Sequence, residues 1–316
     1  MNKRTLGNSS VEVTPIGLGA WQFSEGKGFH GLFWKGLTPD ETVEVVKASL
    51  SGGVNWIDTA EIYGNGRSER GVSHSLQSLG IEEENVVIAT KWNPVLRFSG
   101  SILKTFPKRV ENLSPYSIDL HQIHNPFSFS SVQAEMEKMT KLYQEQKIKA
   151  IGVSNFSVKK MRKAFEALEV ETIPLATNQV KYSLLDRKIE RNGVMDAAKE
   201  LGITIIAYSP LEQGLLTGKY HQNPELIKKL PFLRKRRMKK ALKKTEKVIE
   251  SLIQIGENYE ATPSQVALNW LVSFHGERVV AIPGASKPSQ ATSNAGVMSF
   301  SLSSAELTEL DEVSRN

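Results

Sequence analysis

Short runs of β-branched and other apolar residues alternate with longer stretches of helical period along most of the chain. This alternation is typical of repeated βα units around a parallel sheet. We expect eight strands, at Ile16–Ala20, Val54–Asp58, Val86–Lys91, Ser117–His124, Lys149–Ser154, Ala176–Val180, Thr204–Ser209 and Val279–Pro283. Eight parallel strands, each followed by a helix, favour a closed barrel.

Sequence signals also predict where several helices begin. Thr38–Glu41 and Thr262–Gln265 each combine a threonine, a proline at the first helical position and a Glu or Gln three residues after the threonine. This combination predicts a capping box at the start of a helix. Ser303–Glu306 has the same spacing without the proline, so we expect a helix over Ser303–Ser314.

Two other segments lie outside the eightfold repeat. Thr5–Val13 alternates around Gly7-Asn8, which predicts a hairpin, and we expect it to close the bottom of the barrel. The stretch from Leu211 to about Thr245 is too long for an ordinary loop. The predicted fold is therefore an α/β TIM barrel, (β/α)8, with an N-terminal β-hairpin and two extra helices, in one domain over residues 1–316.

Composition narrows the class of protein. The chain of 316 residues is 40% hydrophobic and 23% charged, and it contains no cysteine. Disulfides, thiolate metal sites and cysteine nucleophiles are excluded, and we expect no metal. No apolar run approaches the roughly 18 residues of a membrane span. The start, MNKRTLGNSS, lacks an apolar signal region, so we expect a soluble cytoplasmic protein.

The net charge of +6 comes from one segment. Residues 225–247 carry eleven Lys or Arg against two Glu, so the rest of the chain is net negative. A solvated helix or loop is favoured over a nucleic-acid site, because Phe232 is the segment's only aromatic residue and single-strand binders interleave rings with charge. A cover over an anionic cofactor is a third interpretation.

Chemically active side chains close three neighbouring strands. Asp58 ends the second strand and is followed by Tyr63, Lys91 ends the third, and His124 ends the fourth. Each has an ordinary structural explanation when taken alone: a turn cap, a half-buried ring, a solvated cation or a core histidine. Together they place an acid, a phenol, an ammonium and an imidazole at the rim where barrel enzymes carry their active sites.

A phenol with a reference pKa near 10 needs a neighbouring cation to act as a proton donor near neutral pH. Lys91 at about 4 Å would attract the phenolate of Tyr63 by roughly 4 kcal/mol, which lowers its pKa by about three units before desolvation subtracts some of it. Asp58 would keep Lys91 charged, and His124 would orient a substrate oxygen. This set suits protonation of a carbonyl oxygen while a hydride reaches the carbon.

The other strands end in groups suited to a flat amide ring and phosphates. Ser154-Asn155, Asn178-Gln179 and Tyr208-Ser209 follow the fifth, sixth and seventh strands, although Ser154 and Asn155 would equally serve as helix caps. The loop Pro283–Pro288 leads into a helix and is suited to a phosphate, although turn chemistry alone also explains it. The Gly17-Leu18-Gly19 stretch lacks the third glycine of a dinucleotide fingerprint, because position 22 is Gln22.

Over essentially its whole length the chain resembles the aldo-keto reductase family. The resemblance rests on Asp58–Gly64 (Asp-Thr-Ala-Glu-Ile-Tyr-Gly), Ala89–Trp92 and Gln122–Pro126. It implies that Tyr63 is the acid/base, that Lys91 and Asp58 tune it and that His124 orients the carbonyl. It also implies NADPH-dependent reduction of an aldehyde or ketone, with NADPH/NADP+ bound by Trp21, Ser154, Asn155, Gln179, Tyr208, Ser209, Leu211, Gln213, Gly214, Lys219, Gly284, Ser286, Lys287, Gln290 and Asn294.

Departures from the family pattern bear on the substrate. Many members have tryptophan where this chain has Asn125, and lysine where it has Gly284, which moves the expected 2′-phosphate contact to Ser286 and Lys287. We expect the pocket for a small carbonyl substrate to be lined by Trp21, Phe33, Trp34, Trp92, Asn125 and Phe127.

A regulatory, cofactor-binding protein is the main alternative. The segments 209–211, 218–220 and 284–286 are similar to the potassium-channel β subunits, and the cofactor segments place the chain closer to that branch. The resemblance to those subunits also implies loss of the catalytic histidine, whereas this chain keeps His124. Sequence leaves the particular carbonyl, the direction of the reaction and the oligomeric state open.

Overall fold

Eight parallel strands form the centre of the molecule. The structure, a computed structural model, describes residues 1–26, 36–229 and 232–315. Within these residues the strands pair in the order β10-β9-β8-β7-β6-β5-β4-β3. The bridges from Ile16 to Ala281 and from Gly19 to Gly284 join the two ends of this order and close the barrel. The predicted barrel is confirmed.

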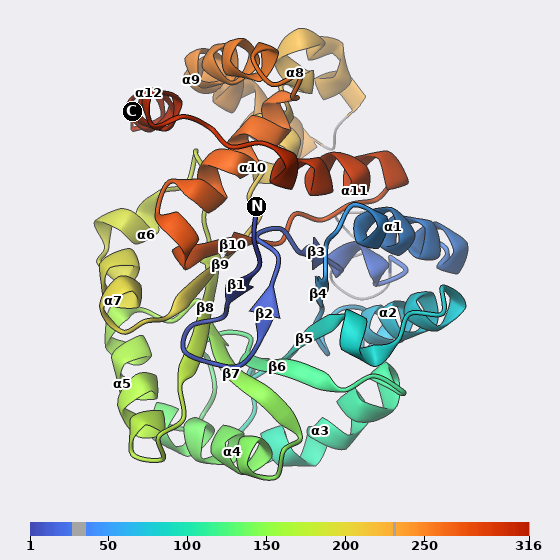
Figure 1. Ribbon diagram of the computed structural model, residues 1–316, viewed down its shortest axis with the longest axis vertical. Coiled ribbons are helices and arrows are strands. Elements are labelled where there is room, and N and C mark those ends of the chain that lie inside the picture. The colour runs from blue at the N-terminus through green and yellow to red at the C-terminus, as the bar shows by residue number, and fades with distance from the viewer. Residues whose placement is uncertain (27–35, 230–231, 316) are drawn as a thin grey trace.

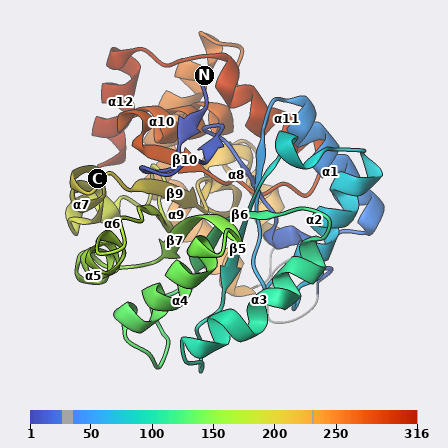
Figure 2. The same cartoon turned by 60° about the horizontal axis from the view of Figure 1, so that its bottom comes forward.

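The strands lie where the apolar runs predict them, within a few residues. They are β3 Leu18–Gly19, β4 Trp56–Asp58, β5 Val87–Trp92, β6 Ile118–Ile123, β7 Ile148–Ser154, β8 Leu175–Lys181, β9 Thr204–Tyr208 and β10 Val279–Ala281. The main helices between them are α1 Pro39–Ser51, α2 Arg67–Ser78, α3 Gly100–Leu113, α4 Val132–Gln144, α5 Val158–Glu169, α7 Val194–Glu200, α10 Pro263–Ser273 and α11 Pro288–Ala295. Figures 1 and 2 show these helices around the outside of the strands.

The predicted hairpin closes one end of the barrel. Strands β1 Arg4–Thr5 and β2 Glu12–Val13 pair antiparallel and lie across the barrel end that faces the viewer in Figure 1. Gly7 at the turn has φ of 57°, and a Cβ there would lie 2.6 Å from the carbonyl oxygen of Ala176. An apolar cluster therefore runs from the hairpin into the barrel, with members Leu6, Val11, Val13, Trp56, Ala89, Leu120, Ala150, Ala176, Ile206, Val280 and Ile282.

The extra helices also form. Capping boxes occur at Thr38, Thr262 and Ser303, as predicted, and the last of these begins α12 Ser304–Ser314. The long stretch after β9 contains α8 Lys219–Gln222 and α9 Phe232–Glu257, which lie beyond α10 at the top of Figure 1. No helix among the described residues has the length and apolar character to cross a bilayer.

Candidate active site

The four residues singled out as a catalytic set meet at the C-terminal ends of β4, β5 and β6. Asp58 is the last residue of β4, Lys91 lies near the end of β5, and His124 directly follows β6. Tyr63 lies on the loop between β4 and α2. Because β4 pairs with β5 and β5 with β6 in parallel, the ends of the three strands share one rim. The sequence prediction that these groups lie together is consistent with this geometry.

Lys91 is the buried centre of the set. Its ammonium contacts the carboxylate of Asp58 and donates to the carbonyl oxygen of Thr59 at 2.9 Å. It also lies 5.2 Å from the centre of the Tyr63 ring. The Tyr63 ring packs edge-on against the His124 ring, with 5.6 Å between ring centres. The Tyr63 ring therefore lies against both the Lys91 ammonium and the His124 imidazole.

Burial and the Lys91 charge act in opposite directions on the pKa of Tyr63. Desolvation, the largest effect, raises the pKa of the phenol, whereas the Lys91 ammonium lowers it and the Asp58 carboxylate raises it. The net pKa lies above the usual value, so the expected fall is wrong: desolvation outweighs the lysine. For Lys91, desolvation lowers the pKa, but Asp58 and Tyr63 together raise it above its usual value.

The second oxygen of Asp58 binds two amides inside the barrel. Gln122 on β6 donates to it at 3.1 Å, and Gln179 on β8 donates at 2.9 Å. Sequence reasoning missed Gln122. Its position two residues before His124 was the available signal, because side chains two apart in a strand point to the same face, here the face that lines the barrel. Because Gln179 commits its side-chain amide nitrogen to Asp58, its side-chain oxygen Oε1 is left to accept a hydrogen bond.

A cavity of about 590 Å³ opens above this rim, a volume within the usual range of about 300–1,000 Å³ for small-molecule sites. Asp58, Tyr63 and His124 line it. The residues expected to hold a cofactor that also line it are Trp21, Ser154, Asn155, Gln179, Tyr208, Ser209, Leu211, Gln213, Gly214, Lys219, Gly284, Ser286, Gln290 and Asn294. The cavity wall therefore brings together residues from almost every strand end of the barrel.

One end of the cavity presents amides and an aromatic ring beside the proposed catalytic set. The Tyr208 hydroxyl donates to the Asn155 side chain at 3.0 Å, and the Asn155 amide donates to Ser154 Oγ at 3.0 Å. The Ser154 hydroxyl in turn donates to the carbonyl oxygen of Gln179 at 2.9 Å. These bonds fix the Tyr208 ring and the Asn155 amide relative to each other and to the backbone of β8.

The other end lies where the loop after β9 meets the start of α11. Ser209 and Gln213 have positive φ values of 52° and 56°. A Cβ placed on Gly214 would lie 3.4 Å from Lys219 Nζ, so the lysine passes close to the glycine. On the facing side, Gln290 Oε1 accepts from the Ser286 backbone at 2.8 Å. Two chain segments far apart in sequence therefore face each other across the cavity.

A family model, the aldo/keto reductase family, matches residues 15–315. The chain belongs to this family. Aldo-keto reductase YhdN of Bacillus subtilis is 30% identical, over 100% of this chain and 94% of the relative. The NADH-specific methylglyoxal reductase of Escherichia coli is also 30% identical, over 99% of this chain and 98% of the relative. The structure of glycerol dehydrogenase from Gluconobacter oxydans superposes with a TM-score of 0.83 at 27% identity, covering 98% and 94% of the two chains.

Membership in the aldo/keto reductase family makes this protein an oxidoreductase whose chemistry is NAD(P)H-dependent carbonyl reduction. Hydride transfer of this kind is performed by the nicotinamide, while the protein supplies binding, orientation and electrostatics.

Several residues expected at the site of this aldo-keto reductase do not line the described cavity. Trp92 is 1% exposed, packs between the sheet and the helices, and donates to Ser101 Oγ at 3.1 Å. Phe127 is 70% exposed, and neither it nor Asn125 lines the cavity that the described residues form. Lys287 is exposed and is likewise absent from that wall. Phe33 and Trp34 lie outside the described residues, and of the expected substrate pocket Trp21 alone lines the described cavity.

The cavity of this aldo-keto reductase also has walls that sequence reasoning missed, including Gln22, Thr217, Ser264, Ser289 and Ser293. Gln22 is the most informative. Its Oε1 is buried without a hydrogen-bond partner among the described residues. A Cβ on Gly284 would lie 2.2 Å from the Gln22 amide nitrogen, so glycine at 284 admits this side chain. The Ser264 position was signalled by the capping box at Thr262, which predicts a helix start without saying that it faces the cavity.

Proposed function

We propose that this aldo-keto reductase uses NADPH to reduce an aldehyde or ketone to an alcohol, with Tyr63 as the proton donor. The observation that carries the proposal is that Tyr63 and His124 line the 590 Å³ cavity together, with the buried Lys91 ammonium against the Tyr63 ring. A proton donor, a cation that tunes it and an imidazole are the groups that a carbonyl oxygen requires as it gains negative charge.

When bound, the reduced nicotinamide supplies a hydride to the carbonyl carbon. Tyr63 donates its hydroxyl proton to the carbonyl oxygen and becomes phenolate. Lys91 stabilises that phenolate, because its ammonium lowers the pKa of Tyr63 against the opposing effect of burial. Asp58 keeps Lys91 charged inside the barrel, and His124 holds the carbonyl oxygen beside the phenol.

The residues present fit a dinucleotide. Gln22 contributes a buried acceptor without a partner among the described residues, which a bound donor group would satisfy. Gln179, Asn155 and Ser154 would hold the carboxamide, and Tyr208 would lie on the ring face. Lys219 is a cation on the cavity wall and would neutralise phosphate charge.

The choice of NADPH over NADH is part of the proposal. The start of α11 at Pro288 would seat the 2′-phosphate, with Ser286 on the cavity wall and Lys287 beside it. Backbone N–H groups and hydroxyls at a helix N-terminus favour an added phosphate. The E. coli relative is NADH-specific by name, so the two coenzymes need to be compared directly.

The test is oxidation of NADPH by the purified protein with small aldehydes, ketones and quinones, beside NADH and a Tyr63→Phe variant. We expect turnover with NADPH that disappears in Tyr63→Phe, while the variant still binds NADPH. Loss of binding together with turnover would contradict the role of Tyr63. Tight binding of NADPH with no turnover on any carbonyl would favour the regulatory alternative.

A further inference from the structure

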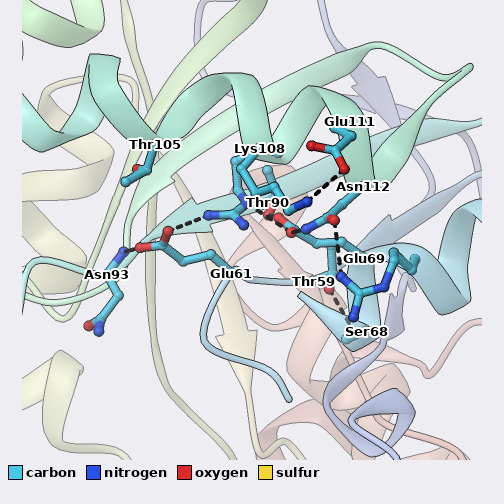
Figure 3. Close-up of polar contacts among 12 residues, drawn as sticks. Thr59, Glu61, Ser68, Glu69, Thr90, Asn93, Thr105, Lys108, Glu111 and Asn112 are labelled. Carbon is cyan, nitrogen blue, oxygen red and sulfur yellow. Dashed lines mark hydrogen bonds and ion pairs between the residues drawn. The ribbon is translucent and has the colours of Figure 1, made fainter. Parts of the chain in front are cut away.

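A cluster of buried ionic side chains lies directly behind the proposed catalytic set. It consists of Glu61 on the loop that carries Tyr63, Glu69 on α2, and Arg109 on α3. Figure 3 shows Glu61 and Glu69 turned towards the same region between α2 and α3. The mechanism proposed above uses none of these three groups.

Glu61 ties the Tyr63 loop to the neighbouring strand. Its side chain accepts from the backbone N–H of Asn93 at 2.5 Å, from Arg97 at 2.6 Å and from Arg109. Its backbone N–H donates to the carbonyl oxygen of Lys91 at 3.2 Å. Glu61 lies two residues before Tyr63, so whatever holds Glu61 also limits where the phenol can move.

The Glu69 side chain links α2 to β5, because it binds Thr90, the residue directly before Lys91. It accepts from Thr90 Oγ1, from Arg109 Nε and from Asn112, each at 2.8 Å. The backbone of Ser68, next to Glu69, donates to the carbonyl oxygen of Tyr63 at 3.2 Å. The Tyr63 loop is therefore held at both ends by carboxylates that share one guanidinium.

Arg109 is the group that both carboxylates need. Burial raises the pKa of Glu69, and the Arg109 charge and its hydrogen bond oppose that rise. The other cation, Arg97, reaches Glu61 but is partly exposed. His121 on β6 supplies no charge, because burial and Arg109 lower its pKa to about 3.

We propose that Arg109 is a positioning residue for the proton donor: by binding Glu61 and Glu69 together it fixes the Tyr63 loop against β5 and so sets the contact between Tyr63 and Lys91. The planar guanidinium suits this task, because its separate N–H groups reach two carboxylates at once. The proposal rests on the role of Tyr63 given above and extends it to a residue that does not line the described cavity.

The test compares Arg109→Met and Arg109→Lys in the full chain. We expect Arg109→Met to lower kcat by about 10- to 100-fold, because misplacing a reacting group by about 1 Å costs up to about 100-fold. The Kd for NADPH should stay within about twofold, since none of the residues expected to hold the coenzyme is changed. Arg109→Lys keeps the positive charge but lacks the planar guanidinium that reaches both carboxylates, so it should recover only part of kcat.

The pH profile of kcat separates positioning from general weakening of the fold. Reduction needs protonated Tyr63, so activity falls on the alkaline side as Tyr63 ionises. Lys91 lowers the pKa of Tyr63, while Asp58 raises it and His124 faces the ring edge-on. A Tyr63 that has moved away from Lys91 should therefore ionise at higher pH, and the alkaline limb of kcat should shift upward in Arg109→Met.

Arg187 offers a matched control. It is as buried as Arg109, at 6% exposed, and it also binds two carboxylates, Glu190 and Asp311. None of these three residues lines the described cavity. Arg187→Met should lower the melting temperature in the same way but leave kcat and its pH profile unchanged. Should Arg109→Met yield no soluble protein, Glu61→Gln decides the matter, because it keeps the side-chain shape and removes the charge that Arg109 binds.

The outcomes are distinct. A folded Arg109→Met with kcat and pH profile within about twofold of the parent would overturn the proposal. So would unchanged kcat in Glu61→Gln, or an equal loss of kcat in Arg187→Met. If Tyr63→Phe retains turnover, the proposed function itself fails. If Tyr63→Phe is inactive while the Arg109 variants are fully active, only the role of Arg109 fails.

Discussion

Asp58→Asn tests the buried ion pair beneath the proposed proton donor. Asp58 is 1% exposed and Lys91 is 0% exposed, and the carboxylate contacts the ammonium as well as Gln122 and Gln179. Asparagine keeps the shape and one acceptor oxygen but removes the negative charge. The substitution therefore leaves a buried ammonium without a carboxylate partner, next to the Thr59 carbonyl oxygen and the Tyr63 hydroxyl.

Breaking a buried pair by removing one partner costs about 3–5 kcal/mol. For a chain of this size each kcal/mol lowers the melting temperature by about 2 °C, so the loss is about 6–10 °C. Asp186→Asn is the control, because Asp186 pairs with the partly exposed Lys181 and its loss should cost about 1 kcal/mol or less. A second substitution, Lys91→Met in Asp58→Asn, should recover part of the stability, since no unpaired charge remains.

The pH dependence gives a sign that a general packing defect would not. In the parent, Asp58 helps to raise the pKa of Lys91 against burial, so the pair stabilises the fold fully below pH 10.5 and less above the folded pKa. In Asp58→Asn burial dominates and the pKa of Lys91 falls. The unfolded state then binds more protons than the folded state, so the stability of the variant rises as pH rises towards 10.5.

The assay is urea unfolding of parent, Asp58→Asn, Asp186→Asn and the double variant between pH 6 and about pH 10, around the reference pKa of lysine. The gap in unfolding free energy between parent and Asp58→Asn should narrow as pH rises. A gap below about 1 kcal/mol, or one that does not depend on pH, would refute the reasoning, because an unpaired buried ammonium cannot be that inexpensive.

Two further predictions concern the coenzyme and the Glu190 carboxylate that pairs with Arg187. Lys219→Ala should weaken the binding of NADPH and NADH alike, whereas Lys287→Ala should weaken the binding of NADPH much more than that of NADH. Fluorescence titration with both coenzymes checks this. Equal weakening of both by Lys287→Ala would place the 2′-phosphate elsewhere. Although burial opposes it, hydrogen bonds from His275 and Arg187 hold the pKa of Glu190 at about 2. The ionised Glu190 therefore contributes up to about 3 kcal/mol to the free energy of unfolding, present above pH 4.5 and lost as pH falls towards 2. In Glu190→Gln, the free energy of unfolding measured with urea should depend less on pH in this acid range. An unchanged pH dependence would contradict this.

The barrel and its polar rim were predictable because both depend on local patterns. Parallel strands share the direction of their C-terminal ends, so Asp58, Lys91 and His124 had to share a rim once the strands were placed. The same alternation should have excluded Trp92. It follows Lys91 in β5, so its side chain points to the opposite face, towards the helices.

Other features depend on distances that no local pattern specifies. Arg109 meets Glu61 across 48 residues and Glu69 across 40 residues, and only the packing of α3 on α2 brings them together. The net pKa of Tyr63 could not be given its sign from sequence either. The cation was identified, but the cost of burying the phenol depends on the depth of the loop in the folded barrel.

The central claim is that Tyr63 supplies the proton in an NADPH-dependent carbonyl reduction. The most direct measurement is single-turnover oxidation of bound NADPH on mixing with an aldehyde, in the parent and in Tyr63→Phe, after equal loading with NADPH has been shown by fluorescence. The account predicts rapid oxidation of the bound NADPH in the parent and none in the loaded variant. Equally rapid oxidation in both proteins would contradict it.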